Sequence, residues 1–391
     1  MPEAAASANA VPRVLALSQD PASAITRIRL GESLQRLQAR GALQARQRGF
    51  GQWRRADLAW ADVLLLQRPL SQEAVELQQR CRGRGLPVVV ELDDLLIAPA
   101  AHLLQRQLLL QARPRLLALL AAADLLTVST TPLARALADA LGPAAPPLLQ
   151  VPNAGMDWAG TPARHDDRSP LTLLLVGSDL QQLGALGPAL QALPWQDGRL
   201  RLCCVGPIGA ALQGLALPAG LPHQALPLLP RSAFLDTLAA LPNPVGLMPL
   251  DDSDFSRCKS AVKYFDYAMA GIPSLCAWRS PYAEVLHHGQ DGWLCGDDPA
   301  DWTAALQDAL GPAGRRQAVA DAARRQVLAH HGPAQQDAAW QAALTRAAAL
   351  RRRPTPNVSE RLADALADAA SAPSRWLQAA NRARLARRRR R

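Results

Sequence analysis

The stretch VGLMPLDDSDFSRCKSAVKYFDYAMAGIPSLCA, residues 245–277, decides the expected fold. Residues 245–250 form an apolar run that predicts a buried strand, and the acidic loop after it carries helix-capping side chains. A helix is expected to start near Ser256 and to end at Gly271, because glycine takes the left-handed cap conformation easily and a proline follows two residues later. Residues 272–277 predict the next strand. Strand, loop, helix and strand in this order make one βαβ unit of a parallel sheet.

The expected helix carries two cations and one carboxylate at helical spacing. Lys259, Lys263 and Asp266 are four and three residues apart, so they share one face. Ligands of parallel sheets bind outside the carboxyl ends of the strands, and a helix start with nearby cations attracts phosphate. Asp266 could accept hydrogen bonds from sugar hydroxyls. A solvated face with an intrahelical ion pair is the alternative.

Two runs in this region resemble a known family. KSAVKYFDYAMAGIPSLCAW at 259–278 and SPYAEVLHHGQDGWLC at 280–295 resemble the nucleotide-sugar-binding segment of retaining family 4 glycosyltransferases, the "group 1" enzymes of GT-B fold. Asp266 stands at the second of the family's two glutamates, and Glu284 matches a later acid. Cys258 occupies the place of the first glutamate, as in a subgroup that carries Lys-Ser-x-x-Lys there.

The resemblance implies an α/β protein of GT-B type, with two Rossmann-like doubly wound domains facing a cleft. In the family the second acid holds the nucleotide ribose, and cations hold the donor diphosphate. Relatives carry Arg or Lys soon after the glycine that matches Gly177, whereas Asp179 follows here. The resemblance implies no metal ion and no cofactor beyond the nucleotide-sugar co-substrate. The expected donor-binding residues are Arg257, Lys259, Ser260, Lys263, Asp266, Gly177, Ser178 and Glu284.

A second acidic site is expected after the apolar strand at 87–92. The run VVVELDDLL resembles the amino-terminal domain of the same subgroup and ends in Asp93 and Asp94. Either acid could be the base that activates an acceptor hydroxyl, or could cap a helix expected over 101–122. The expected catalytic residues are therefore Asp93, Asp94 and Lys259. His102 is expected at the surface.

The first strand is expected at 13–17, followed by a helix to about Gly41. Neither the GxGxxG fingerprint nor a glycine-rich loop follows that strand. Arg27 and Arg29 on this helix could contact phosphate or acceptor, and solvated arginines are the more common alternative. The predicted segments are a disordered start at 1–11, an acceptor domain at 12–158, a linker at 159–169, a donor domain at 170–350 whose last helix packs back on the first domain, and a basic, partly disordered tail at 351–391.

The tail carries most of the net charge. Residues 351–391 hold twelve arginines against three carboxylates, which is nine of the ten formal net positive charges. Scattered apolar residues with a terminal arginine run could lie on an anionic membrane, and a solvated tail is the alternative. Nucleic-acid binding is not favoured, because the basic residues are not interleaved with aromatic ones on a folded domain.

Location and thiol chemistry follow from what the sequence lacks. No signal peptide or membrane-length apolar run is visible, so a cytoplasmic protein, peripheral on the inner membrane face, is expected. The six cysteines show no metal-ligand spacing. Cys203, Cys204, Cys276 and Cys295 are expected to be buried hydrophobes, whereas Cys258, at a predicted helix start beside Lys259, could be a reactive thiol.

Together these features predict a glycosyltransferase. It would move a sugar from a nucleotide-sugar to a glycan or lipid-linked acceptor hydroxyl with retained configuration, in surface polysaccharide or glycolipid assembly. A catalytically inactive GT-B scaffold is the main alternative, because the first glutamate and the cation after Gly177 are missing. An arginine-tail nucleic-acid binder is the third.

Overall fold

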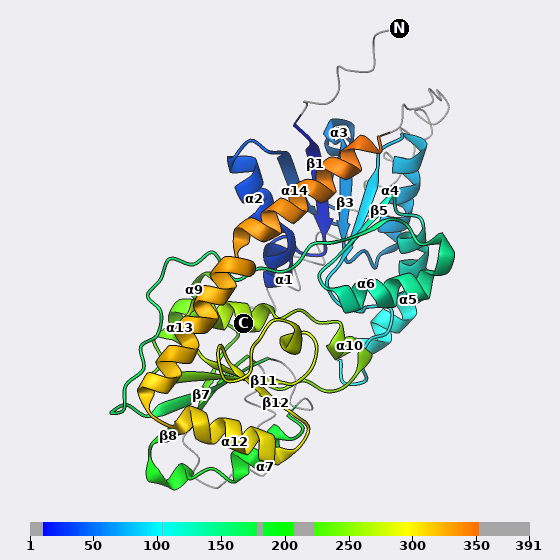
Figure 1. The fold of residues 1–391 in the computed structure, drawn as a ribbon. Helices are drawn as coiled ribbons and strands as arrows, with labels where there is room; N and C mark the ends of the chain where they lie inside the picture. The colour runs from blue at the N-terminus through cyan, green and yellow to red at the C-terminus, as the bar shows by residue number, and fades with distance from the viewer. Residues whose placement is uncertain (1–10, 104, 178–182, 207–222, 352–391) are drawn as a thin grey trace.

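The computed structural model describes residues 11–103, 105–177, 183–206 and 223–351. Two six-stranded parallel sheets follow each other along the chain (Figure 1). The first, of order β2-β1-β3-β4-β5-β6, consists of β1 Arg13–Ser18, β2 Gln44–Gly49, β3 Val63–Gln67, β4 Val88–Leu92, β5 Leu125–Val128 and β6 Leu148–Gln150. The second, of order β12-β11-β10-β7-β8-β9, consists of β7 Leu171–Val176, β8 Leu200–Val205, β9 His223–Leu226, β10 Pro244–Met248, β11 Ser274–Ala277 and β12 Trp293–Cys295.

Helices connect the strands and cover both faces of each sheet, which is the doubly wound arrangement that the sequence predicts. Those of the first domain are α1 Ala24–Thr26, the π-helical turn η1 Arg27–Gly31, α2 Glu32–Ala39, α3 Arg55–Trp60, α4 Gln72–Gly83, α5 Arg106–Ala121, α6 Thr131–Leu141 and η2 Gly142–Ala144. Those that follow are α7 Leu186–Gln191, η3 Trp195–Asp197, α9 Arg231–Ala239, α10 Asp254–Arg257, α11 Val262–Met269, η5 Tyr282–Glu284, α12 Pro299–Leu310, α13 Ala313–His330 and α14 Pro333–Ala349.

The central strands are mostly apolar because both of their faces are buried. In β3, Val63 and Leu65 pack into the hydrophobic cluster on the α2 and α14 side, whereas Leu64 and Leu66 pack into the cluster on the α4 and α5 side. All four side chains are fully buried. This is why the pattern of a parallel strand is a continuous apolar run and not an alternation.

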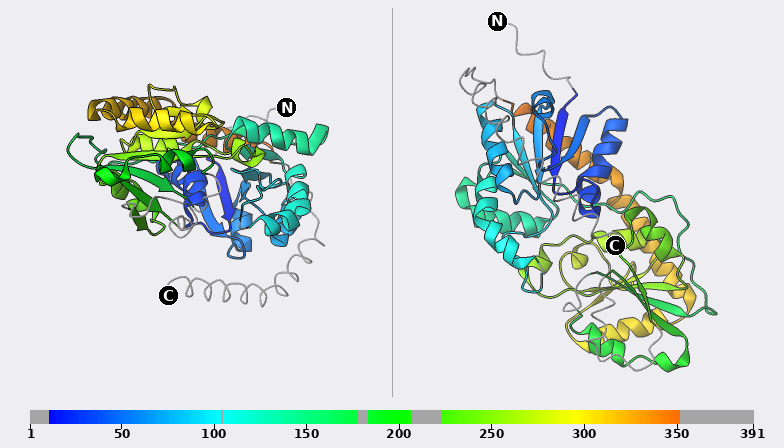
Figure 2. Two further views of the ribbon diagram at one scale, coloured as in Figure 1. Left: turned by 90° about the horizontal axis from the view of Figure 1, so that it is seen from below. Right: turned by 180° about the vertical axis from the view of Figure 1, so that it is seen from behind.

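The last helix, α14, returns from the second domain and packs on α2 of the first (Figures 1 and 2). Trp340 is fully buried there, and Asp337 accepts hydrogen bonds from Arg36 and Arg40 at 2.8 Å each. The connection between the sheets, residues 151–170, contains neither helix nor strand and includes the segment predicted as a linker. Of the predicted disordered start at 1–11, residues 1–10 lie outside the described residues, as do residues 352–391 of the predicted tail at 351–391.

Several local predictions are wrong. β2 and β12 were not expected as strands; β2 has the polar sequence QARQRG because it lies at the sheet edge, where half-buried side chains suffice. α5 begins at Arg106 and not near residue 101. It continues through Pro114, and apolar residues on both sides of the proline, Leu109 and Leu116, are buried against the domain core.

Candidate functional site

The order of the strands in the second sheet reverses next to β7, and the carboxyl ends of β7 and β10 lie side by side there. From β7 the chain proceeds to β8 and β9 on one side, and β10 then lies on the other side of β7. Ligands of open α/β sheets bind in the crevice outside such a switch point. Gly177 follows β7 at this place, and the loop after β10 leads to α10 and α11.

Lys263, from the first turn of α11, lies over the end of β7. Its Nζ donates a hydrogen bond to the Val176 carbonyl oxygen at 2.8 Å, and a Cβ at Gly177 would lie 3.6 Å from the same nitrogen. The residue is exposed to solvent, and its amine is partly desolvated where it lies against the end of β7. This partial desolvation, together with the charge of Lys259, lowers the pKa of Lys263 to about 8. An anion bound here would favour the charged amine.

The expectation of one continuous helix in this region is wrong, because the turn 258–261 separates α10 from α11. A continuing helix would pair the Cys258 carbonyl with the N–H four residues ahead. Instead, this carbonyl accepts a hydrogen bond from the Thr130 hydroxyl of the first domain at 2.8 Å. Phe255 and Cys258 are also buried in the first domain's hydrophobic cluster. Contact with the other domain therefore interrupts the helix.

Burial has a further consequence for Cys258, because it raises the pKa of the thiol to about 11. The alternative of a reactive thiolate at this position is therefore wrong.

Lys259 and Ser260 occupy this turn. The Lys259 ammonium lies 5.0 Å from the centre of the Phe255 ring, and Ser260 accepts a hydrogen bond from the Asn153 amide at 2.6 Å. Among the 43 lysines and arginines of the chain, Lys259 and Lys263 are the only lysines. Within the described residues, neither ammonium forms an ion pair with a carboxylate. Two neighbouring cations without a protein anion make a site for a phosphate-bearing ligand.

Asp266 was expected on the same face as the two lysines, and the structure contradicts this placement. Its Oδ1 accepts a hydrogen bond from the Met156 N–H at 2.9 Å, and its Oδ2 pairs with Arg231 at 3.2 Å. Arg231 also pairs with Glu32 of the first domain at 2.8 Å. Burial raises the pKa of Asp266, against the opposing effect of Arg231. The carboxylate thus ties α11 to the connection between the sheets and to the first domain.

The other predicted donor residues are spread around the switch point. Arg257 is exposed on α10 and pairs with Asp252 at 2.8 Å, and this hydrogen bond raises its pKa. Glu284 is exposed at the end of η5, and no contact within the described residues joins it to the lysine pair. Ser178 lies outside the described residues.

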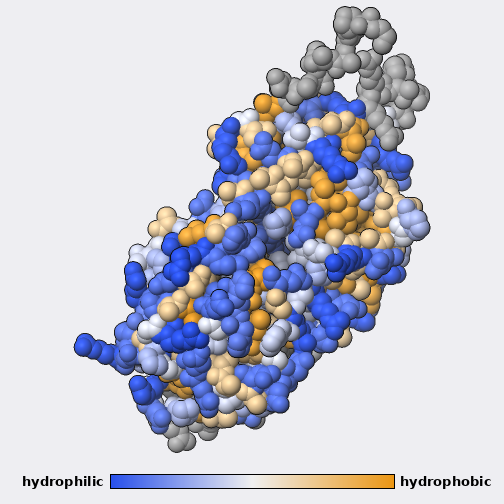
Figure 3. Space-filling model, viewed as in Figure 1, coloured by the Kyte–Doolittle hydropathy of each residue, from blue (hydrophilic) through white to orange (hydrophobic). Residues whose placement is uncertain are grey.

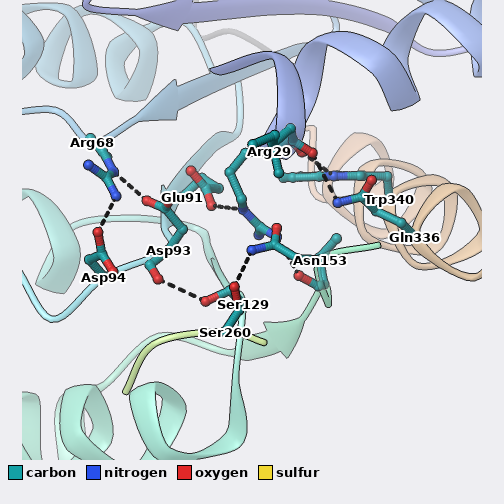
Figure 4. Close-up of polar contacts among 12 residues, drawn as sticks. Arg29, Arg68, Glu91, Asp93, Asp94, Ser129, Asn153, Ser260, Gln336 and Trp340 are labelled. Carbon is teal, nitrogen blue, oxygen red and sulfur yellow. Dashed lines mark hydrogen bonds and ion pairs between the residues drawn. The ribbon is translucent and has the colours of Figure 1, made fainter. Parts of the chain in front are cut away.

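Asp93 and Asp94 follow β4 at the carboxyl edge of the first sheet, and both pair with Arg68, which follows β3 (Figure 4). The expectation that either acid caps a helix is wrong, because α5 begins twelve residues later at Arg106. Arg68 has a positive φ of 45°, a conformation that costs a non-glycine residue free energy. One guanidinium between two carboxylates leaves one net negative charge on this group.

Arg29 is a functional candidate whose role the sequence did not reveal. The early arginines were expected in solvent, but Arg29 is 0% exposed, and its Nε pairs with Glu91 at 2.7 Å (Figure 4). Burial raises the pKa of Glu91 to about 7. The glutamate in the apolar run VVVEL was the available signal, since a buried carboxylate needs a partner.

His102 was expected at the surface, and this is also wrong. Its side chain is 6% exposed and its Nδ1 lies 3.2 Å from Asp251, which follows β10 in the second domain. The contact between His102 and Asp251 and the ion pair between Arg231 and Glu32 each join one domain to the other. The two domains are therefore in direct polar contact on either side of the switch point.

Cavities are small near the switch point. One of about 100 Å³ is lined by Gly184, Leu250, Asp251, Ala277, Arg279 and Asp297. A larger one of about 420 Å³ lies at the opposite, amino ends of β4 and β5, beside Leu86, Asp124 and Leu350, away from where ligands of such sheets bind.

Figure 3 shows mixed polar and apolar surface over both lobes. The described residues contain no group of three or more potential metal ligands and no helix suited to crossing a bilayer.

Comparison with known proteins gives likeness of fold. No protein-family model matches the chain, and no curated protein matches its sequence. HepE of Anabaena, solved with UDP and glucose, has a TM-score of 0.59 at 13% identity, covering 86% of this chain and all of its own. Sucrose-phosphate synthase from Thermosynechococcus elongatus has a TM-score of 0.60 at 12% identity, covering 87% of this chain and 98% of its own.

A third similar structure is the UDP-forming α,α-trehalose-phosphate synthase from Burkholderia vietnamiensis. Its TM-score is 0.57 at 12% identity, and the match covers 88% of this chain and all of that one. These solved structures are glycosyltransferases of GT-B fold. The chain has the GT-B fold, which confirms the fold class that the sequence predicts.

Proposed function

We propose that the chain is a glycosyltransferase that moves a sugar from a nucleotide-sugar donor to an acceptor hydroxyl. The observation that carries this proposal is the pair Lys259 and Lys263 at the switch point of the second sheet, neither of which forms an ion pair with a carboxylate within the described residues. A diphosphate fits two adjacent ammonium groups better than one phosphate does, because each cation can meet a separate phosphoryl group. The nucleotide-sugar donors of glycosyl transfer carry such a diphosphate.

Supporting this proposal, the similar structures include one solved with UDP and glucose and two sugar-phosphate synthases. The resemblance of residues 259–295 to the donor segment of family 4 enzymes agrees with the same chemistry. From that resemblance we further propose retention of the anomeric configuration, independence from metal ions and a role in surface polysaccharide or glycolipid assembly. The acceptor would be a glycan or a lipid-linked sugar.

In the proposed reaction the bond between the anomeric carbon and the diphosphate oxygen breaks, and the acceptor oxygen bonds to that carbon. Negative charge develops on the leaving diphosphate, where Lys259, Lys263 and the Ser260 hydroxyl can stabilise it. Loss of one such donor costs roughly 3 kcal/mol or more in barrier, or about a hundredfold or more in rate. The pair would supply the charge that a divalent metal supplies in other transferases.

The acceptor hydroxyl must lose its proton in the same reaction. The carboxylates Asp93 and Asp94 stand at the carboxyl edge of the first sheet, and they carry one net negative charge once Arg68 is counted. We propose that they orient the acceptor by accepting its hydroxyl hydrogen bonds and receive the proton. Arg68 fixes their positions by pairing with both carboxylates.

A GT-B protein without transferase activity is the second candidate. Specific observations favour it: Cys258 replaces the first acid of the family motif, and both oxygens of Asp266 already have protein partners. Such a protein would bind the nucleotide as a scaffold. Membrane contact through the arginine-rich tail and a cytoplasmic location remain proposals from the sequence, and nucleic-acid binding is not proposed.

Thermal unfolding with UDP, GDP, ADP, dTDP and CMP tests the donor site. A ligand at 100 times its dissociation constant adds roughly 2.7 kcal/mol to the free energy of unfolding, which raises the melting temperature by several degrees. We expect one nucleotide class to stabilise the wild type and the control Arg325→Ala, which removes an exposed cation on α13. Lys263→Ala and Lys259→Ala should lose this stabilisation. If no nucleotide stabilises the wild type, the proposed function is wrong.

An assay of glycosyl transfer then distinguishes the transferase from the inactive scaffold. A transferase releases free nucleoside diphosphate when the stabilising nucleotide-sugar is supplied with acceptor extracts. A scaffold shows binding to the same nucleotide without release.

A further inference from the structure

A chain of hydrogen bonds runs from the buried centre of the first domain to the turn that carries the two lysines (Figure 4). Glu91 accepts from Arg29 Nε at 2.7 Å, and Asn153 Oδ1 accepts from Arg29 Nη1 at 2.7 Å. Asn153 Nδ2 then donates to Ser260 Oγ at 2.6 Å. Arg29 and Glu91 belong to the first domain, Asn153 to the connection, and Ser260 to the second domain.

The direction of this chain is fixed by chemistry. A guanidinium has only donors, so the Asn153 atom that faces Arg29 must be the amide oxygen. The amide nitrogen therefore faces Ser260 and donates to it. Ser260 Oγ receives this hydrogen bond and keeps its own hydrogen available. Within the described residues, the Ser260 hydroxyl donates to no protein atom.

Arg29 and Glu91, where this series of hydrogen bonds begins, are firmly held by the first domain. Arg29 and Glu91 are both 0% exposed, and Asn153 is 5% exposed. Trp340 of α14 donates its indole N–H to the Arg29 carbonyl at 2.7 Å, and Gln336 of α14 donates to the neighbouring Ile28 carbonyl at 3.1 Å. These contacts fasten the π-helical turn η1. Turns of this kind recur at functional sites, where the extra residue redirects a side chain.

Arg29 is 0% exposed, and its hydrogen bond to Asn153 links it to the turn that carries Ser260. The neighbouring contact, from the Thr130 hydroxyl to the Cys258 carbonyl, holds the other end of the same turn at 2.8 Å. The turn 258–261 belongs to the second domain but is held at both ends by groups outside that domain's sheet.

We propose that Asn153, oriented by the Arg29–Glu91 pair, is a positioning residue that makes Ser260 a dedicated hydrogen-bond donor to the donor diphosphate and holds the Lys259–Lys263 turn in place. This inference rests on the proposed function, because it concerns the same nucleotide site. According to this proposal, residues of the first domain that do not touch the donor affect how tightly the donor's phosphates bind.

Hydrogen–deuterium exchange of the unliganded protein tests the chain without any nucleotide. Asn153→Ala and Ser260→Ala should each speed amide exchange in peptides covering residues 256–265 about fivefold, as expected for loss of one net hydrogen bond. Ser260→Thr keeps the hydroxyl and should exchange like the wild type. The matched control is Thr131→Ala, whose hydroxyl donates to Gln150 at 2.9 Å and does not reach the turn.

Nucleotide binding tests the donor role of Ser260. Asn153→Ala and Ser260→Ala should each weaken binding of the stabilising nucleoside diphosphate about fivefold or more, and leave binding of the matching nucleoside, which lacks phosphates, unchanged. Because Asn153 acts through Ser260, the double variant should bind no more weakly than Ser260→Ala alone. Additive losses would contradict action through Ser260.

The two hypotheses fail in different ways. If both alanine variants keep the wild-type exchange rate in residues 256–265, the positioning role is wrong, whatever the protein binds. If the wild type binds no nucleotide, the proposed function is wrong, and the exchange rates still decide whether the hydrogen-bond chain holds the turn. Should Asn153→Ala fail to fold, the comparison of Ser260→Ala with Ser260→Thr decides both points.

Discussion

Raising the pH through about 8 should weaken nucleotide binding, because Lys263 loses its charge in this range. Its pKa is lowered to about 8 by partial desolvation and by Lys259. A lysine with this pKa is about 91% charged at pH 7 and about 9% charged at pH 9. The terminal phosphate of a nucleoside diphosphate is already largely ionised above pH 7, since its last pKa is about 6.

The magnitude follows from the charged fraction. If only the charged amine binds the diphosphate, the dissociation constant should rise about tenfold between pH 7 and pH 9, which is about 1.4 kcal/mol of binding free energy. The free energy of unfolding of the protein without nucleotide should rise with pH, whereas nucleotide affinity falls. The pKa is about 8 in the folded state and 10.5 without a shift, so the unfolded chain binds more protons in this window. The free energy of unfolding should therefore rise as the pH rises from about 8 to 10.5.

Isothermal titration calorimetry at constant ionic strength, from pH 7 to pH 9, measures the effect. Lys263→Ala should bind weakly and without this pH dependence. Lys259→Ala removes the neighbouring charge that lowers the pKa of Lys263, so its transition should move to higher pH. Since the chain has only two lysines, reductive methylation with ¹³C-formaldehyde gives two side-chain NMR signals whose titration can be followed directly. A wild-type dissociation constant that stays flat from pH 7 to pH 9 would refute the reasoning.

Three further predictions concern single substitutions. Lys263→Arg should weaken diphosphate binding about tenfold by calorimetry, because the larger planar guanidinium does not fit the short approach to β7; wild-type affinity would contradict this. Gly177→Ala should also weaken binding, since φ is 156° there and the new methyl group would lie 3.6 Å from Lys263 Nζ, and unchanged affinity would show that neither matters. Arg68→Met should lower the free energy of unfolding by roughly 1–3 kcal/mol in urea denaturation, because Asp93 and Asp94 lose their shared partner. Combining Arg68→Met with Asp93→Asn and Asp94→Asn should restore most of the lost free energy of unfolding. If Arg68→Met alone unfolds at the same urea concentration as the wild type, the ion pairs are not stabilising.

The fold was predictable because strands that are buried in a parallel sheet have mostly apolar sequences. β3, β4 and β7 each have such a sequence, and their order with the intervening helices left few topologies to consider. β2 was missed because an edge strand needs no apolar run. The predicted strand and helix also placed the two lysines after the carboxyl end of β10, and they lie there in the structure.

The shape of the site required the tertiary structure. The interruption of the helix at Cys258 comes from Thr130, more than a hundred residues away in sequence, and no local pattern encodes that contact. Met156 lies 110 residues from its partner Asp266, and Asn153 lies 124 residues from its partner Arg29. Long-range contacts of this kind override local helix propensity, because a helix of a few residues is only marginally stable by itself.

The amino-acid sequence by itself determined the two doubly wound sheets and the placing of both lysines beside the switch point, since hydrophobic periodicity and capping act over a few residues. Only the tertiary structure decided which charges remain free. Packing the two domains together buries Arg29, Arg231 and Asp266 among partners from distant segments. In the part of the chain that the structure describes, it leaves Lys259 and Lys263 as neighbouring cations without a protein anion.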